Sequence, residues 1–86
     1  MNPADYFSVI LTAAGKNRAY YQSAFYYLAA NPRLIEYIGI SERGALTSES
    51  KWIVAKFVYT NNNMVSTIQT SLENQILDDR ATLTYA

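Results

Sequence analysis

The sequence predicts an α+β domain in which two to three N-terminal helices pack on a C-terminal antiparallel β-meander of two to three strands. Apolar residues recur at helical spacing over the first part of the chain, whereas residues 51–60 (KWIVAKFVYT) are rich in β-branched and aromatic residues. Helices followed by adjacent strands are typical of α+β proteins. Because the chain has 86 residues, we expect a single domain, residues 1–86, with a helical part at 1–40 and a β-hairpin or meander part at 51–86.

Two long helices are expected first. One spans residues 2–15, where Asn2 is a good N-cap, Pro3 suits the first helical position and Gly15 supplies the stop. The other spans residues 17–30 and is apolar over much of its circumference. Its apolar stripe consists of Tyr20, Tyr21, Ala24, Phe25 and Leu28, and it is widened by Tyr26 and Tyr27. Such a helix is either central in a core or shared with a neighbouring chain.

A short third helix is expected over residues 32–38. Asn31-Pro32 repeats the pattern of a cap followed by proline, and Gly39 is placed to end the helix. Residues 41–50 are polar and are expected to connect the helical part to the strands.

The strand expected at residues 51–60 is apolar on both faces. One face carries Ile53, Ala55, Phe57 and Tyr59, and the other carries Trp52, Val54 and Val58. A sheet that is open to water on one side alternates more cleanly, so something must cover the second face, and another subunit is the expected cover.

Two further strands are expected after this one. The Asn run at residues 61–63 is a turn signal, because Asn tolerates the left-handed backbone conformation. Residues 64–71 are expected to form the returning strand. Residues 81–85 (ATLTY) alternate and are expected to form a short third strand.

The composition favours a protein that gains stability from other chains. A domain this small buries only roughly 60% of the surface that its unfolded chain exposes, so it needs additional support. The chain has no Cys and no His, which excludes disulfides and removes the commonest metal ligand at neutral pH, and oligomerisation remains. Only 16% of the residues are charged, while eight are Tyr, a residue enriched at protein interfaces.

No catalytic, cofactor or metal site is predicted, and we expect a protein that is not an enzyme. Nucleophile–His arrangements lack their His, and no glycine-rich phosphate loop is present. The carboxylates Glu73, Asp78 and Asp79 do not have calcium-loop spacing. They are interpreted as a solvated turn in which Asp78 or Asp79 pairs with Arg80.

Nucleic acid and membrane are not expected partners. Lys16 and Arg18 lie beside Tyr20 and Tyr21, and such a mixture can stack bases. However, Lys plus Arg and Asp plus Glu are seven each, and nucleic-acid affinity rests mainly on phosphate neutralisation. The apolar runs are also far shorter than the roughly 20 residues that span a bilayer.

The predicted site is therefore a protein interface built of aromatic anchors. The helical candidates are Tyr20, Tyr21, Tyr26 and Tyr27, and the strand candidates are Trp52, Phe57 and Tyr59. Because Trp52 and Phe57 point to opposite faces of their strand, they cannot share one core layer, and one of them is expected to be an intermolecular anchor.

The second half of the chain resembles small structural proteins of tailed bacteriophages. The residues that carry the resemblance lie within 51–86. They are Trp52-Ile53, Tyr59 before the Asn-rich turn, Ile68, Asp78-Asp79-Arg80 and Leu83-Thr84-Tyr85.

The resemblance implies a virion component of the tail, neck or capsid, made in the host cytoplasm and present in several copies. Its expected partners are further copies of itself and other virion proteins, and Arg80 is then expected to pair with an acidic group of this or a neighbouring subunit. The alternatives are a small adaptor or inhibitor that binds one host or viral protein, and, more remotely, a weak single-stranded nucleic-acid binder.

Overall fold

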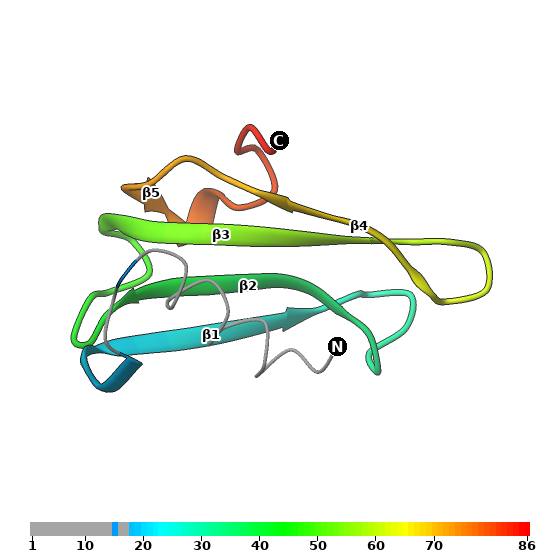
Figure 1. Ribbon diagram of the computed structural model, residues 1–86, viewed down its shortest axis with the longest axis horizontal. Helices are drawn as coiled ribbons and strands as arrows, with labels where there is room; N and C mark the ends of the chain where they lie inside the picture. The colour runs from blue at the N-terminus through cyan, green and yellow to red at the C-terminus, as the bar shows by residue number, and fades with distance from the viewer. Residues whose placement is uncertain (1–14, 16–17) are drawn as a thin grey trace.

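The chain folds as an antiparallel meander in the part that the structure describes, which is Gly15 and residues 18–86 of a computed structural model. The strands β1 (Tyr21–Tyr27), β2 (Ile35–Glu42), β3 (Ser50–Tyr59) and β4 (Val65–Thr70) lie side by side in chain order (Figure 1). A two-residue strand, β5 (Gln75–Ile76), pairs with the beginning of β3. Two single-turn 3₁₀ helices, η1 (Arg18–Tyr20) and η2 (Leu77–Asp79), complete the described elements.

The predicted α+β fold is wrong, because the segments expected to be the second and third helices form β1 and β2. The helix predicted at 2–15 lies outside the described residues apart from Gly15. In β1, the residues of YQSAFYY alternate between the two faces of the sheet and pair with β2 from Tyr21↔Glu42 onward. An apolar stretch of this length fits either a helix or a doubly covered strand, and pairing with a partner strand decides between them.

Asn31-Pro32 begins a turn and not a helix. The backbone N–H of Arg33 donates to the side-chain oxygen of Asn31 at 3.2 Å, and the N–H of Leu34 donates to the Asn31 carbonyl at 3.0 Å. Asn at the first position and Pro at the second are the preferred residues of a β-turn as well as of a helix start. The turn lets the chain reverse from β1 into β2.

The predicted strands at 51–60 and 64–71 are confirmed as β3 and β4, with a turn at the Asn run in which Asn63 has φ +60°. The third strand predicted at 81–85 is wrong. Only an isolated bridge joins Tyr85 to Ser71, and Ala86 and Thr70 exchange two backbone hydrogen bonds of 3.1 Å.

An isoleucine cluster occupies one face of the sheet. It consists of Ile35, Ile38, Ile40, Ala55 and Phe57. Tyr26 pairs with Tyr37 and Tyr27 pairs with Ile35, so Glu36 is an extra residue in β2. This bulge turns the side chain of Ile35 onto the same face as Ile38, which strict alternation would not do.

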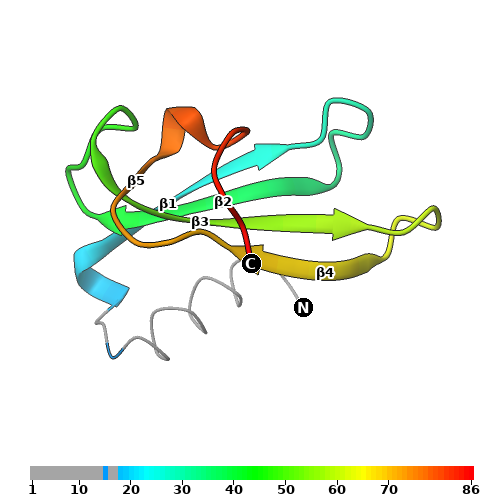
Figure 2. The ribbon, with the colours of Figure 1, turned by 90° about the horizontal axis from the view of Figure 1, so that it is seen from above.

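A tryptophan cluster occupies the opposite face. It consists of Tyr37, Trp52, Val54 and Leu77, with Leu83 and Tyr85 packed against it. The C-terminal segment crosses this face from η2 toward β4 (Figure 2). The second apolar face of β3 is therefore covered by the same chain, and the sequence-based expectation that another subunit covers it is wrong.

Candidate functional site

The strand β1 lies at one end of the sheet that the described residues form. Its inner side pairs with β2 along all seven residues, and no described strand pairs with its outer side. Phe25 and Tyr27 keep 37% and 54% of their surface exposed, and β1 contains no charged residue and no Pro. Natural sheets usually protect their outer strands with charges, Pro or very short length. We call the outer side of residues 21–27 the β1 edge.

The backbone groups that the β1 edge presents follow from the pairing. The N–H of Arg43 donates to the carbonyl of Tyr20 at 3.0 Å, so alternate residues beginning with Tyr20 bond toward β2. Ser23 and Phe25 lie at the positions between these residues, so their backbone groups do not bond toward β2. Their N–H and C=O groups therefore point to the outer side, where a further strand would bond.

The other outer strand, β4, is less open. The backbone N–H and C=O of Thr70 point to the outer side of β4, and both are hydrogen-bonded to Ala86. The end of this edge is therefore occupied by the same chain. The apolar side chains near β4 that are exposed are Met64, Val65 and Leu72. Among the described residues, β1 thus has the longer outer side on which no strand pairs.

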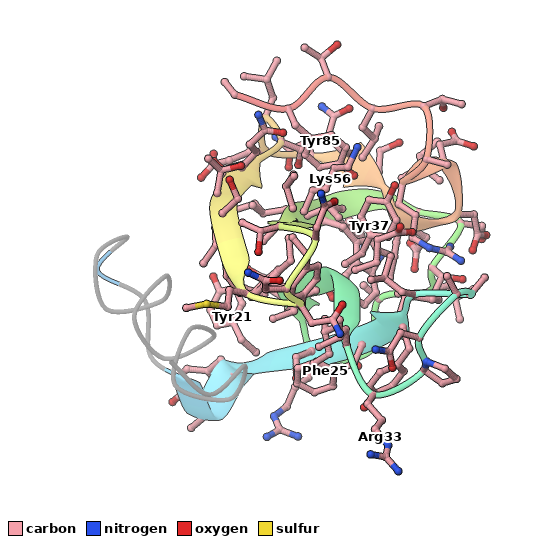
Figure 3. All side chains as sticks on the ribbon, turned by 90° about the vertical axis from the view of Figure 1, so that its right-hand side faces the viewer. Tyr21, Phe25, Arg33, Tyr37, Lys56 and Tyr85 are labelled. Carbon is pink, nitrogen blue, oxygen red and sulfur yellow. The ribbon has the colours of Figure 1, made fainter. Side chains whose placement is uncertain are left out.

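Three tyrosines and two cations gather behind β1, on the face of the tryptophan cluster. We call Tyr26, Tyr37, Lys56, Arg80 and Tyr85 the tyrosine–cation cluster. The Cζ atom of Arg80 lies 3.6 Å from the centre of the Tyr26 ring, and the Lys56 Nζ lies 5.8 Å from that of Tyr85. The Tyr37 and Tyr85 ring centres are 6.0 Å apart. Figure 3 shows Tyr37, Lys56 and Tyr85 together, with Phe25 pointing away from them.

Two phenols of this cluster, those of Tyr37 and Tyr85, are held in their neutral form. Burial, with the nearby Tyr37 and Glu36, raises the pKa of Tyr85 to about 12, against the opposing effect of Arg80. Burial and Glu36 also raise the pKa of Tyr37. The Tyr85 hydroxyl donates to the carbonyl of Arg80 at 2.6 Å. At neutral pH these groups therefore offer ring faces and hydrogen bonds and not acid–base chemistry.

The cluster supports the outer strand. Arg80 belongs to the C-terminal segment and Tyr26 to β1, and neighbouring Tyr37 belongs to β2. Stacking of a guanidinium on a tyrosine ring is favourable, because the ring face is electron-rich. Contact with Arg80 therefore holds one face of β1.

The predicted interface residues separate into three groups. Tyr20 and Tyr27 are exposed, at 68% and 54%. Tyr21, Tyr26, Tyr59 and Arg80 are partly buried. Trp52 and Phe57 are buried, at 2% and 5%, in clusters on opposite faces of the sheet. Neither of these two rings is therefore free on the surface to anchor another molecule.

Several of these residues have partners within the chain. Trp52 Nε1 donates to the Leu46 carbonyl at 2.9 Å, and the Tyr59 hydroxyl donates to the Ile35 carbonyl at 2.6 Å. Arg80 stacks on Tyr26, while Lys51–Glu49 is the only ion pair among the described residues. The interpretation that Asp78 or Asp79 pairs with Arg80 is therefore wrong.

Sequence reasoning did not select Phe25, Tyr37, Lys56 or Tyr85. The run Phe25-Tyr26-Tyr27 carried a signal, because three consecutive aromatic residues in a strand place at least one ring on each face of the sheet. No local signal links Lys56 to Tyr85, since only the path of the C-terminal segment over β2 and β3 brings them together.

Comparison with protein-family models, curated proteins and solved structures gives no match. In the described part of the chain, no helix has the length and hydropathy needed to cross a membrane. The same residues contain no group of three or more acidic side chains that could hold a metal ion.

Proposed function

We propose that this protein is a non-enzymatic structural subunit that acts by packing against other protein chains through the β1 edge. The observation that carries the proposal is the edge itself. It is a seven-residue outer strand without charge or Pro, and it presents Phe25 and Tyr27 beside outward-pointing backbone groups. Addition of a partner strand would satisfy those groups and bury the aromatic rings in one step.

The aromatic character of β1 supports an interface more than a monomer surface. Tyr and Phe bury a large area with few rotatable bonds, which is why they are enriched among residues that dominate binding energy. Tyr20 continues the exposed aromatic surface at the start of the strand. A partner on this edge would therefore gain both main-chain hydrogen bonds and ring contacts.

The assembly that we propose is a tailed-bacteriophage particle. Support comes from the resemblance of residues 51–86 to phage structural proteins, and from the physical match between a small chain with an open edge and a subunit that gains stability from its neighbours. The alternative, an adaptor that binds one host or viral protein, would use the same edge for a strand of a different chain.

Light scattering across a dilution series tests the proposal. We expect wild-type protein to form a multimer whose mass falls on dilution. Tyr27→Lys should shift it to monomer, because lysine on an outer strand opposes strand addition. Met64→Lys is the control, since Met64 is 66% exposed and lies beside β4.

Two outcomes would count against it. Wild-type protein that is monomeric at every concentration would contradict the proposal of a self-assembling subunit. The adaptor alternative would then be favoured. Loss of the multimer in Met64→Lys but not in Tyr27→Lys would place the interface elsewhere than on the β1 edge.

A further inference from the structure

We infer that residues 83–86 form a strap that covers the outer side of β4 at Thr70 and opens as a unit while the sheet stays folded. We call residues 83–86 the strap. The inference goes beyond the proposed function, because it concerns β4 and does not depend on what binds at the β1 edge.

Backbone hydrogen bonds place the strap beside β4 as a short strand would lie. The N–H of Ala86 donates to the carbonyl of Thr70, and the N–H of Thr70 donates to the carbonyl of Ala86, each at 3.1 Å. Next to them, Tyr85 and Ser71 form an antiparallel bridge. The strap, red in Figure 2, runs to the side of β4. It therefore bonds the groups of Thr70 that an added strand would otherwise reach.

Side chains hold the strap on the face of the tryptophan cluster. Leu83 and Tyr85 pack against this cluster and are partly buried. The centre of the Tyr85 ring lies 6.0 Å from that of Tyr37 and 5.8 Å from the Lys56 Nζ (Figure 3). The Tyr85 hydroxyl donates to the Arg80 carbonyl at 2.6 Å. Tyr85 thus attaches the strap through both its ring and its hydroxyl.

The chain immediately before the strap has anchors of its own. Leu77 in η2 is fully buried, and the N–H of Asp78 donates to the carbonyl of Thr47 at 3.1 Å. The N–H and the hydroxyl of Thr82 both donate to the carbonyl of Asp79, at 2.9 Å and 3.0 Å. These contacts do not involve the strap. The strap therefore has a defined point at which it can open, immediately after Thr82.

The strap is held less firmly than the strand that it covers. Its residues are exposed or only partly buried. By contrast, Ala55 of β3, which pairs with Thr70 from the inner side of β4, is fully buried. Local opening costs least free energy where few apolar groups are buried and the backbone hydrogen bonds are exposed. Opening of the strap therefore costs less than separation of β4 from β3.

The strap is a protective device for β4. Natural sheets often cover the backbone groups of their outer strands with another segment, because uncovered groups can pair with other chains. Opening of the strap releases the N–H and C=O of Thr70 together with the ring contacts of Tyr85. The closed strap thus opposes strand addition at this point of β4, and the open strap permits it.

Hydrogen exchange at two adjacent amides separates the strap from the sheet. The N–H of Thr70 donates to Ala86 in the strap, whereas the N–H of Ser71 donates to Val54 in β3 at 2.8 Å. We expect Thr70 and Ala86 to share one protection factor, at least about tenfold below that of Ser71. The measurement is made by NMR on the Tyr27→Lys protein, so that assembly through the β1 edge does not contribute.

Substitutions in the strap test whether it opens as a unit. Tyr85→Ala should lower the protection of Thr70 by about tenfold and that of Ser71 by less than about threefold. Leu83→Ser should act in the same direction, because a unit is weakened by the loss of a contact at either end. Thr84→Ala is the matched control, since this exposed residue lies between the two and should leave Thr70 unchanged.

Ala86→Pro keeps the test valid if Tyr85→Ala destabilises the whole sheet. It removes the N–H that donates to Thr70 and leaves the side chains of the tryptophan cluster unchanged. We expect the same selective loss of protection at Thr70. Light scattering then tests the protective role. In the Tyr27→Lys background, Ala86→Pro and Tyr85→Ala should form larger assemblies than Thr84→Ala does.

Three results would contradict the inference. Equal protection of Thr70 and Ser71 in every variant would mean that the strap opens only when the sheet unfolds. An effect of Thr84→Ala as large as that of Tyr85→Ala would remove the role of the Tyr85 contacts. Variants that open the strap and stay monomeric would reject its protective role. The β1 edge is tested separately, by the masses of wild type and of Tyr27→Lys.

Discussion

Arg80 lies over the ring of Tyr26, with its Cζ atom 3.6 Å from the ring centre. This contact joins the C-terminal segment to the outer strand of the sheet, across β2 and β3. The nearby Tyr85 hydroxyl donates to the Arg80 carbonyl, which fixes the backbone from which the guanidinium extends. The end of the chain is therefore part of the support for the strand that we propose as the interface.

Loss of this stacking should destabilise the fold modestly. We expect Arg80→Ala to lower the free energy of unfolding by about 0.5–2 kcal/mol, as measured by urea denaturation. Arg80→Lys should recover only part of the loss, because an ammonium group does not stack as a planar guanidinium does. A double-mutant cycle with Tyr26→Leu should show coupling, and strictly additive losses would contradict direct contact.

Gly39 is predicted to reject any side chain. A Cβ atom at this position would lie 2.6 Å from Leu77 Cδ1 and 3.1 Å from Trp52 Cε3. Because Leu77 is fully buried, we expect Gly39→Ala to cost about 1–3 kcal/mol in the same assay.

The paired variant Leu77→Ala identifies the cause. Leu77→Ala alone should cost about 2–5 kcal/mol, because it leaves a cavity in the tryptophan cluster. Gly39→Ala added to Leu77→Ala should cost clearly less than it does in wild type, since the new methyl group then enters vacated space. An equal cost in both backgrounds would show that the collision with Leu77 is not the reason.

Stability should fall at high pH. Burial raises the pKa of Tyr85 from 10.0 to about 12, so the folded protein holds this proton more tightly than the unfolded chain does. The resulting stability is complete below about pH 10 and is lost as the pH rises toward 12. The raised pKa values of Tyr37 and Tyr59 act in the same direction.

Tyr85→Phe is the control for the pH dependence. It should flatten the decline in the free energy of unfolding between pH 10 and 12 without abolishing it. The slope is the useful quantity, because the variant also loses the hydrogen bond to the Arg80 carbonyl at every pH. An unchanged slope would mean that Tyr85 titrates alike in the folded and unfolded chain.

Trp52 and Phe57 should behave as core residues. We expect Trp52→Ala and Phe57→Ala each to lower the free energy of unfolding by about 3–5 kcal/mol, because both rings are buried. Tyr27→Ala, at an exposed position, should change the unfolding of dilute protein by less than about 0.5 kcal/mol and yet weaken self-association. A near-neutral Trp52→Ala protein that assembled poorly would reverse this assignment.

The meander was predictable where local preference and long-range pairing agree. The β-branched residues of β3 and the Asn run after it admit few alternatives, so β3, the turn and β4 were found from the sequence. Opposite faces for Trp52 and Phe57 followed from strand alternation alone. The final strand was overpredicted because ATLTY alternates, although only Tyr85 bridges to Ser71.

The first part of the described chain was misread because its local signals are ambiguous. In YQSAFYY, apolar residues on both faces of a strand also satisfy helical spacing, and Asn31-Pro32 can begin either a helix or a turn. This error affected the candidate site most, because the site is built on β1. An outer strand with open backbone groups is a property of sheet order, and the sequence carries no local mark of which strand is last.

The sequence by itself determined the aromatic, weakly charged and cysteine-free character of the protein, two strands of its sheet and the turn between them. Only the tertiary structure decided that the tyrosine-rich segment is a strand, that it is the last of the described strands at its end of the sheet, and that Arg80 stacks on Tyr26 of this strand. The physical reason is that composition and turns are local properties, whereas the choice between helix and strand in a short apolar segment depends on hydrogen bonds to residues far away in the chain.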